Sequence, residues 1–323
     1  MYKFLMVFIF IISISISFLI NKIIIKKFNN KIELERKYLF FHNDKKNTPF
    51  FGGISIILTS LICFIIYTVL IKYDELTAIS ILSFLLFGFV GFIDDLLKYK
   101  KKNSEGLNPY VRLLLESVFT LLIIYLLGFN YSIFKSLNIN GLKIGLFSFP
   151  LFIFLFLGGS NASNIVDGVD GLDAGLTLIA LFPNLFLAFK TNSYIYALFI
   201  ISIIGALIGF LFFNSHPAKI FLGDTGSLSL GNIIIVTSII MNNIIMIPLT
   251  MFIFIIETLS VIIQVLYYKK TKKRIFIMAP LHHHFEMKKI EESKIVITFY
   301  LIGFILSFIA ILLGDNYANI INW

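Results

Sequence analysis

The stretch FLMVFIFIISISISFLINKIII, residues 4–25, contains one basic residue and no acidic residue. About 20 apolar residues are enough to cross the hydrocarbon core of a bilayer as a helix. A backbone in lipid must satisfy its own hydrogen bonds, so this stretch predicts a transmembrane α-helix. It is too long for the apolar region of a signal peptide, and no small-residue cleavage site follows it. We therefore interpret it as the first membrane span.

The rest of the chain has the same character. Of 323 residues, 58% are hydrophobic and 14% are charged, whereas about a quarter of the residues in soluble domains are charged. Further spans are predicted over residues 50–71, 76–93, 111–129, 144–157, 174–189, 194–213, 227–241, 244–267 and 295–313. The sequence thus predicts an all-α integral membrane protein with about ten transmembrane helices, forming one polytopic domain over residues 1–323. Its single cysteine, Cys63, excludes disulfides within the chain and cysteine-based zinc sites.

The distribution of lysine and arginine predicts the orientation of this domain. With ten spans, 22 of the 27 basic residues fall in loops on one side of the membrane. Cytoplasmic loops carry such an excess, so we predict that both termini lie outside and that the basic loops face the cytoplasm. Most of this charge is expected to contact anionic lipid head groups. A second interpretation is that it attracts a polyanionic soluble substrate.

Several carboxylates occur beside hydrophobic sequence on the same basic side. They are Asp94 and Asp95 in GFIDDLLK, Asp167 and Asp170 in NIVDGVDGL, and Asp224 in FLGDTGS. A carboxylate near membrane depth is costly unless it is paired, hydrated or bound to a cation, and such residues are functional by default. Aspartates at several span ends on one face predict a shared polar cavity.

Each of these aspartates also has a purely structural interpretation. Asp94 and Asp95 could end a helix, although their side chains would point about 100° apart and meet different partners. Asp167 and Asp170 alternate with glycines and could be turn or cap residues, and Asp224 could be a helix N-cap. Several carboxylates on a basic membrane surface also suit phosphoryl transfer assisted by a magnesium ion. No glycine-rich Walker loop occurs, so an ATP-driven motor is not predicted.

Five segments on the predicted cytoplasmic face follow one another along the chain. They are KKNTPFFGG from Lys45, GFIDDLLK from Gly91, SNASNIVDGVDGL from Ser160, FNSHPAKIFLGDTGSLSLG from Phe213 and KRIFIMAPLHHHFE from Lys273. Together they resemble the phospho-N-acetylmuramoyl-pentapeptide transferases. Those are polytopic enzymes of the polyprenyl-phosphate hexosamine-1-phosphate transferase superfamily. The aspartate segments are shared across the superfamily, whereas the histidine triplet resembles this branch specifically.

The resemblance implies transfer of phospho-N-acetylmuramoyl-pentapeptide from its UDP carrier to undecaprenyl phosphate. UMP is released, and the first lipid-linked peptidoglycan precursor is formed. The resemblance also implies Mg2+ as cofactor and a multi-pass location in the bacterial inner (cytoplasmic) membrane, with the active site facing the cytoplasm. UDP-N-acetylmuramoyl-pentapeptide, undecaprenyl phosphate and membrane lipids are the expected partners. No nucleic-acid partner is expected, and a homodimer is left open.

The same resemblance implies roles for individual residues. Asp224 is the implied magnesium ligand and, with Asp94 and Asp95, a catalytic group near the phosphates. One route has Asp94 deprotonate the lipid phosphate for direct attack, and another passes through a covalent aspartyl intermediate. The sequence is compatible with both. The implied substrate-binding residues, with Phe221 as a platform for uracil, are Lys45, Asn164, Asp167, Asp170, Asn214, Phe221, His282, His283 and His284.

The chain departs from the family pattern at two places. Residues 47–53 read NTPFFGG instead of the usual GTPTMGG, so the loop geometry beside Lys45 is not implied. Arg112 and Glu116 stand where lysine and glutamine are common, and arginine does not reproduce lysine geometry. We assign neither residue to the site.

Two further polar groups are open to more than one interpretation. Adjacent imidazoles are poorly placed to bind one ion, so we interpret the triplet as hydrogen-bonding or substrate-binding groups. An ordinary polar loop is the alternative. Glu257, Ser260 and Gln264 share one side of a predicted helix, and we favour interhelical packing for them.

Two rival functions use the same observations. A UDP-N-acetylhexosamine-1-phosphate transferase for another surface polymer would need the same aspartates, but the histidine triplet argues against it. A transporter of an anionic solute could use buried acids, yet transporters typically have duplicated halves with broken helices. The sequence has no such internal symmetry.

Overall fold

The computed structural model describes residues 2–28, 48–103, 105–130, 138–139, 142–143 and 148–318. In this part of the chain, ten helices are long and apolar enough to cross a membrane. They are α1 (Tyr2–Phe28), α2 (Gly52–Leu70), α3 (Glu75–Lys101), α4 (Pro109–Asn130), α6 (Ser148–Val166), α7 (Leu172–Lys190), α8 (Tyr194–Asn214), α9 (Gly223–Ile240), α11 (Phe252–Thr271) and α13 (Glu292–Ala318). Shorter elements are η3 (Ile244–Met246), α10 (Ile247–Thr250) and α12 (Leu281–Met287), with a two-residue antiparallel ladder of β1 (Asn138–Ile139) and β2 (Leu142–Lys143).

Nine of the ten predicted spans are confirmed as single helices, with shifted ends. α3 continues past residue 93 to Lys101, so Asp94 and Asp95 lie inside the helix and not at its end. α6 continues past residue 157 through the polar segment GGSNASNIV to Val166. The prediction of one continuous helix over residues 244–267 is wrong, because η3 and α10 precede α11. Pro248, which lacks an N–H group, lies in the first turn of the short α10.

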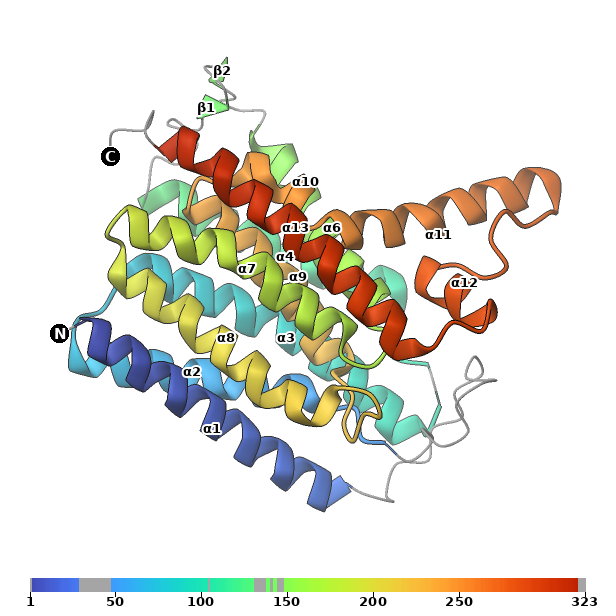
Figure 1. Ribbon diagram of the computed structural model, residues 1–323, viewed down its shortest axis with the longest axis horizontal. Coiled ribbons are helices and arrows are strands. Elements are labelled where there is room, and N and C mark those ends of the chain that lie inside the picture. The colour runs from blue at the N-terminus through green and yellow to red at the C-terminus, as the bar shows by residue number, and fades with distance from the viewer. Residues whose placement is uncertain are drawn as a thin grey trace.

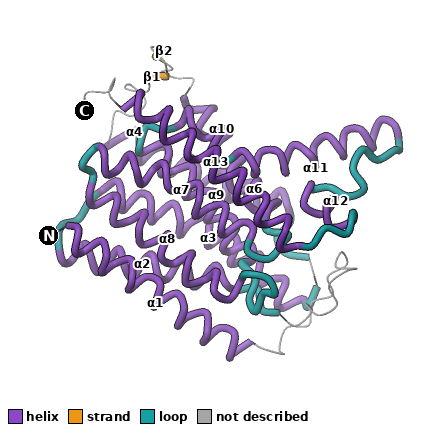
Figure 2. The backbone as a smooth tube through the Cα atoms, in the orientation of Figure 1, coloured by secondary structure: helices purple, strands orange, loops and turns teal. Residues whose placement is uncertain are grey.

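The long helices pack side by side around α9 (Figure 1). α9 is the most buried span and contacts α2, α3, α6 and α7. Small residues allow this close packing: a side chain at Gly231 of α9 would clash with the backbone of Gly159 in α6. α11 instead projects from the bundle, as Figure 2 shows, and only 22% of its most apolar 18-residue stretch is buried. The core therefore surrounds α9, while α11 presents most of its surface to the surroundings.

The polar sequence motifs meet at one end of the bundle. Here α3, α6 and α8 end, and α4, α7, α9 and α13 begin, so the connecting loops lie together (Figure 2). We call this the motif end. Its cytoplasmic orientation and the position of both termini outside remain predictions from the lysine and arginine count.

Candidate active site

Three aspartates from two helices meet at the motif end. Asp94 and Asp95 come from the last turns of α3, and Asp224 comes from the first turn of α9. One carboxylate oxygen from each lies within 4.8 Å of the others. Three of the carboxylates expected to share a polar cavity therefore lie close together. We call them the aspartate cluster.

Asp95 fixes the beginning of α9. Its Oδ1 accepts a hydrogen bond from the Asp224 N–H at 3.0 Å, and its Oδ2 accepts from the Thr225 N–H at 2.8 Å and hydroxyl at 2.6 Å. A negative charge at a helix N-terminus is favourable, because the first N–H groups have no partner within the helix. A side chain at Gly223 would clash with the Phe50 carbonyl, which explains the glycine. This geometry favours a positioning role for Asp95.

Asp94 points toward different partners, as the 100° rotation between neighbours predicts. Its Oδ1 accepts a hydrogen bond from the Leu107 N–H at 2.6 Å, so the segment after α3 lies against the carboxylate. A side chain at Gly106 would clash with that carboxylate. The other oxygen, Oδ2, is 2.6 Å from Lys98 Nζ. Asp94 thus has one oxygen held by a backbone N–H and the other beside a cation.

Asp224 is held between two cations. Lys98 Nζ is 3.0 Å from Oδ1, and Arg112 Nη1 of α4 is 3.0 Å from Oδ2. Arg112 Nε also donates to Glu116 Oε1 at 3.0 Å. The alternative of Asp224 as a helix N-cap is not observed, because α9 begins at Gly223 and the Asp224 side chain points to these cations. The aspartate cluster is therefore part of a larger ion-pair network.

The oxygen ligands of the aspartate cluster fit a magnesium ion. Mg2+ binds through one or two carboxylates together with phosphate oxygens. A second group in the described residues, Asp170 with His216 and Glu292, could also hold a cation, but it includes an imidazole. The all-oxygen set and the adjacent cations favour the aspartate cluster for a metal-bound diphosphate. Asp224, exposed enough to be reached, is the best ligand candidate among them.

The central polar block lies along the end of α6 and the start of α7. The Asn164 amide donates to Ser227 Oγ of α9 at 2.9 Å, which joins this block to the helix that bears Asp224. Asp167 follows α6 and is half-buried, whereas Asp170 is buried in the turn before α7. Asp173 accepts hydrogen bonds from Ser163 Oγ and serves the packing of α6 against α7.

The candidate nucleotide residues lie between α8 and α9. The Asn214 amide donates to the Ile220 carbonyl at 2.9 Å and so closes the connecting loop. Phe221 donates its N–H to the Pro49 carbonyl at 2.7 Å, and its ring is partly exposed. Asn214 thus fixes the connecting loop, and the half-buried Phe221 lies at its end. Lys45 lies outside the described residues.

The histidine triplet forms the first turn of α12, and its members point to different partners. His283 Nδ1 is 2.6 Å from Glu286 Oε2, and His284 Nδ1 accepts the Ile277 N–H at 3.1 Å. His282 is fully buried beside Glu257 of α11, with Nδ1 3.2 Å from Oε2. That these imidazoles do not bind one ion together stays a prediction.

Two contacts hold the segment that carries the triplet on α11. The Glu257 carboxylate accepts the His282 N–H at 3.1 Å. Gln264 Oε1 accepts the N–H groups of Ile275 and Phe276 at 3.1 and 3.0 Å. Sequence reasoning interpreted Glu257 and Gln264 as interhelical packing. Glu257 does join two helices, α11 and α12, whereas Gln264 anchors the chain between them.

His282 is fully buried in this arrangement. Burial lowers the pKa of His282, and the nearby Glu257 opposes this shift without cancelling it. Neither ring nitrogen has a hydrogen-bond partner of good geometry within the described residues. A side chain at Gly168 would clash with Nε2, so the α6–α7 turn lies directly against the imidazole.

Sequence reasoning missed several residues of the site. Lys98 follows Asp94 by four positions, the helical spacing of an ion pair, and this signal was present. Arg112 and Glu116 have the same spacing but were set aside because they differ from the family pattern. His216 had no local signal, because its partners Asp170 and Glu292 lie 46 and 76 positions away.

Comparisons with known proteins show the family of this chain. Residues 76–242 match the family described as glycosyl transferase family 4. The chain is 38% identical over 277 residues to phospho-N-acetylmuramoyl-pentapeptide-transferase of Bacillus subtilis (strain 168), which covers 84% of this chain and 85% of that protein. Enzymes of the same name from Bacillus thuringiensis (strain Al Hakam) and Bacillus cereus (strain AH187) are each 38% identical over 280 residues, or 84% of this chain and 86% of theirs. The resemblance inferred from the five motifs is confirmed, and the chain belongs to the phospho-N-acetylmuramoyl-pentapeptide transferase family.

Proposed function

We propose that this membrane protein transfers phospho-N-acetylmuramoyl-pentapeptide from its UDP-linked donor to undecaprenyl phosphate. An oxygen of the lipid phosphate forms a bond to the sugar-bearing phosphorus, and the bond to the bridging oxygen breaks, so that UMP leaves. The observation that carries this proposal is the aspartate cluster with Lys98 and Arg112, found in a chain 38% identical to enzymes of that name.

The cations of the cluster are suited to the diphosphate. Arg112 Nη2 is buried and has no hydrogen-bond partner in the described part of the chain, while Lys98 lies between Asp94 and Asp224. In phosphoryl transfer, catalysis depends mainly on positioning and on stabilisation of charge at the phosphoryl oxygens. Arg112 and Lys98 would hold the donor phosphates, and Asp94 would orient or deprotonate the attacking lipid phosphate.

Asp224 would hold Mg2+, with Asp94 close enough to share it. The ion would neutralise charge on the diphosphate as a Lewis acid. Asp95 keeps Asp224 in place through its hydrogen bonds to the start of α9. Phe221 would stack on the uracil, and the histidine triplet would contact the muramoyl part of the donor.

The location follows from the composition and the expected orientation. We place the motif end on the cytoplasmic side of a bacterial inner membrane, where the soluble UDP-linked donor is available. The lipid acceptor would reach the same end from within the bilayer, past the exposed apolar surface of α11. The homodimer stays a prediction.

The deciding experiment measures UMP release by the purified protein in detergent with undecaprenyl phosphate and magnesium. UDP-N-acetylmuramoyl-pentapeptide is compared with UDP-N-acetylglucosamine, and Asp224→Asn is compared with wild type. Asp74→Asn, at the opposite end of α3, is the matched control, because asparagine also caps a helix.

We expect turnover of the pentapeptide donor that EDTA and Asp224→Asn abolish and Asp74→Asn leaves intact. Turnover of only the simpler donor would favour the hexosamine-1-phosphate alternative. Absence of turnover with either donor, in a folded sample with lipid present, would refute both transferase functions.

A further inference from the structure

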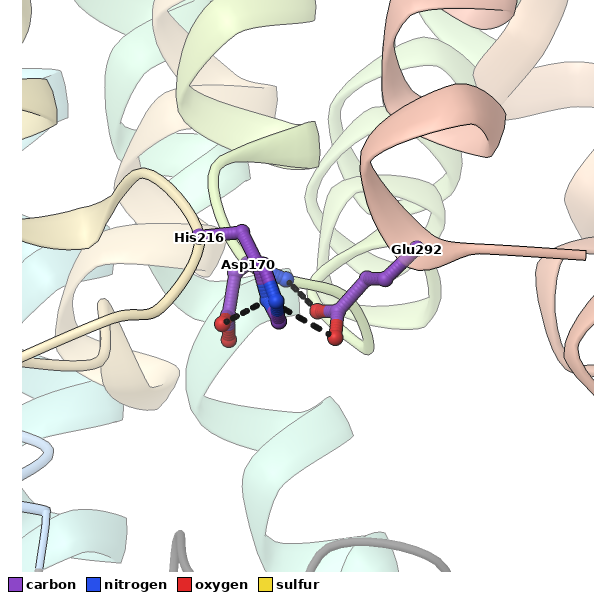
Figure 3. Close-up of side chains that lie close together, drawn as sticks. All are labelled: Asp170, His216 and Glu292. Atoms are coloured by element: carbon purple, nitrogen blue, oxygen red, sulfur yellow. Dashed lines mark hydrogen bonds and ion pairs between the residues drawn. The ribbon is translucent and has the colours of Figure 1, made fainter.

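Three side chains from distant parts of the sequence meet at the motif end outside the aspartate cluster. Asp170 lies before α7, His216 follows α8, and Glu292 begins α13 (Figure 3). His216 Nδ1 is 3.1 Å from Asp170 Oδ2 and 3.2 Å from Glu292 Oε2. The two carboxylates are buried, whereas 43% of the His216 side chain is exposed. We call these three residues the clamp.

Backbone groups complete the clamp. The Asp170 N–H donates to Glu292 Oε1 at 2.7 Å, and the Ala218 N–H donates to Asp170 Oδ2 at 3.0 Å. Glu292 therefore accepts from the Asp170 N–H and lies within ion-pair distance of His216 on another segment. Asp170 in turn holds two residues of the α8–α9 loop. Hydrogen bonds to ionised carboxylates are about twice as strong as neutral ones, so this arrangement fixes the geometry of the three segments.

The clamped loop is the one that carries Phe221. Its other side is fixed by the hydrogen bond from Asn214 to the Ile220 carbonyl and by the hydrogen bonds that Phe221 makes with Pro49 and Gly52. On the remaining half of the loop, His216 is exposed and Ala218 is half-buried. The clamp is what ties this half of the loop to α7 and α13.

We propose that His216 and Glu292 are positioning residues that set the Phe221 loop through Asp170 and thereby determine affinity for the uridine part of the donor. This inference rests on the proposed function. Neither residue belongs to the aspartate cluster, so the chemical step is not expected to depend on them. Loss of the clamp should raise the donor KM and the Kd for UMP, while kcat at saturating donor and the KM for the lipid acceptor stay close to wild type.

The test uses the full-length protein in detergent with His216→Gln, Glu292→Gln and the double variant. Glu291→Gln is the matched control: it removes the same charge one position earlier, where the side chain is 70% exposed and contacts only Lys294 among the ion pairs described. Donor KM, acceptor KM and kcat come from UMP release, and the Kd for UMP comes from calorimetry. The thermal midpoint of each variant is recorded alongside.

We expect each single variant to raise donor KM and UMP Kd about tenfold, the size expected for losing one hydrogen bond to a charged group. The double variant should raise them far less than a hundredfold, because both residues belong to one network. Glu291→Gln should match wild type. If donor KM and UMP Kd are unchanged in the variants while the wild-type protein turns over the donor, the positioning role of the clamp is overturned. The proposed function would still stand.

A lower kcat, with donor KM and acceptor KM raised to the same extent and a lowered thermal midpoint, would mean that the three residues only stabilise the fold. This result also overturns the inference. A wild-type protein that neither binds UMP nor turns over the donor would overturn the inference and the proposed function together.

Discussion

Glu116→Gln is the substitution for which the structure gives the sharpest prediction. Glu116 is fully buried, and its carboxylate accepts three hydrogen bonds. Arg112 Nε donates to Oε1 at 3.0 Å, while Asn161 Nδ2 and Ser160 Oγ donate to Oε2 at 2.8 and 3.2 Å. A glutamine must turn its NH2 group toward one of these donors. Either Arg112 or Asn161 then loses its acceptor.

The magnitude follows from the partner that is lost. A hydrogen bond to a charged group contributes about 1.5–3 kcal/mol. Removing one partner of a buried ion pair costs about 3–5 kcal/mol when the remaining charge is left alone. Arg112 keeps Asp224 as a partner at 3.0 Å, so the cost falls below that range. We expect about 2–3 kcal/mol of destabilisation.

The assay is the thermal midpoint in detergent, measured by intrinsic fluorescence, with UMP release measured on the same samples. Glu116→Gln should lower the midpoint by several degrees and reduce turnover, because Arg112 is less well oriented toward Asp224. Glu105→Gln, an exposed acid in the α3–α4 connection, is the control and should behave as wild type. The double variant Arg112→Lys with Glu116→Gln recreates the pair common in the family. It should be closer to wild type than Glu116→Gln alone.

Two results would refute this reasoning. A midpoint for Glu116→Gln equal to that of Glu105→Gln would mean that the buried carboxylate contributes nothing through its charge. If the double variant lowers the thermal midpoint and turnover by the sum of the effects of the two single variants, Arg112 and Glu116 act independently. This would contradict the 3.0 Å contact between them.

Three further predictions concern the surrounding contacts. Asp95→Asn removes the charge that three donors at the start of α9 share. We expect a lower thermal midpoint and loss of turnover. An unchanged midpoint and unchanged turnover would contradict the positioning role of Asp95. Gly168→Ala should displace His282 and raise donor KM. Gly158→Ala should do neither, because an added Cβ at Gly158 meets no atom within 4 Å. Measuring donor KM for both variants checks this prediction. Burial lowers the pKa of His282 from its ordinary 6.5, so the unfolded state binds the proton more readily. Stability should therefore fall as pH drops below about 6.5, and thermal midpoints of wild type and His282→Asn across this pH range test whether the fall depends on His282.

The helical architecture could be predicted because membrane spans leave a simple signal. Nine of the ten apolar stretches form single helices, but helix ends that consist of polar residues were harder to predict. The prediction stopped at residue 93 because Asp94 and Asp95 interrupt the apolar run. In the structure the helix continues, and these carboxylates find partners in the α3–α4 connection and on α9. The break before α11 was missed, because Pro248 lies within a run of apolar residues that reads as one span.

The candidate site was predictable only where residues adjacent in sequence carry the chemistry. Asp94, Asp95 and Asp224 were identified from their motifs. Glu257 was interpreted as packing because helical spacing reports which face a residue occupies and not which segment folds back onto it. His216 could not be recognised at all, since nothing beside it in sequence indicates Asp170 or Glu292.

The same interactions hold the motif end together and shape its chemistry. Water stabilises separate charges at the surface of a soluble protein, but at the end of a membrane bundle buried carboxylates need partners supplied by the protein. Asp95 and Glu116 meet this need with donors from α9, α4 and α6. These contacts also fix Asp224 and Arg112, the groups proposed to hold the metal and the phosphates. Loss of activity alone therefore cannot identify a catalytic residue here. The paired measurements of thermal midpoint, donor KM and kcat separate a group that reacts from one that holds the reacting groups in place.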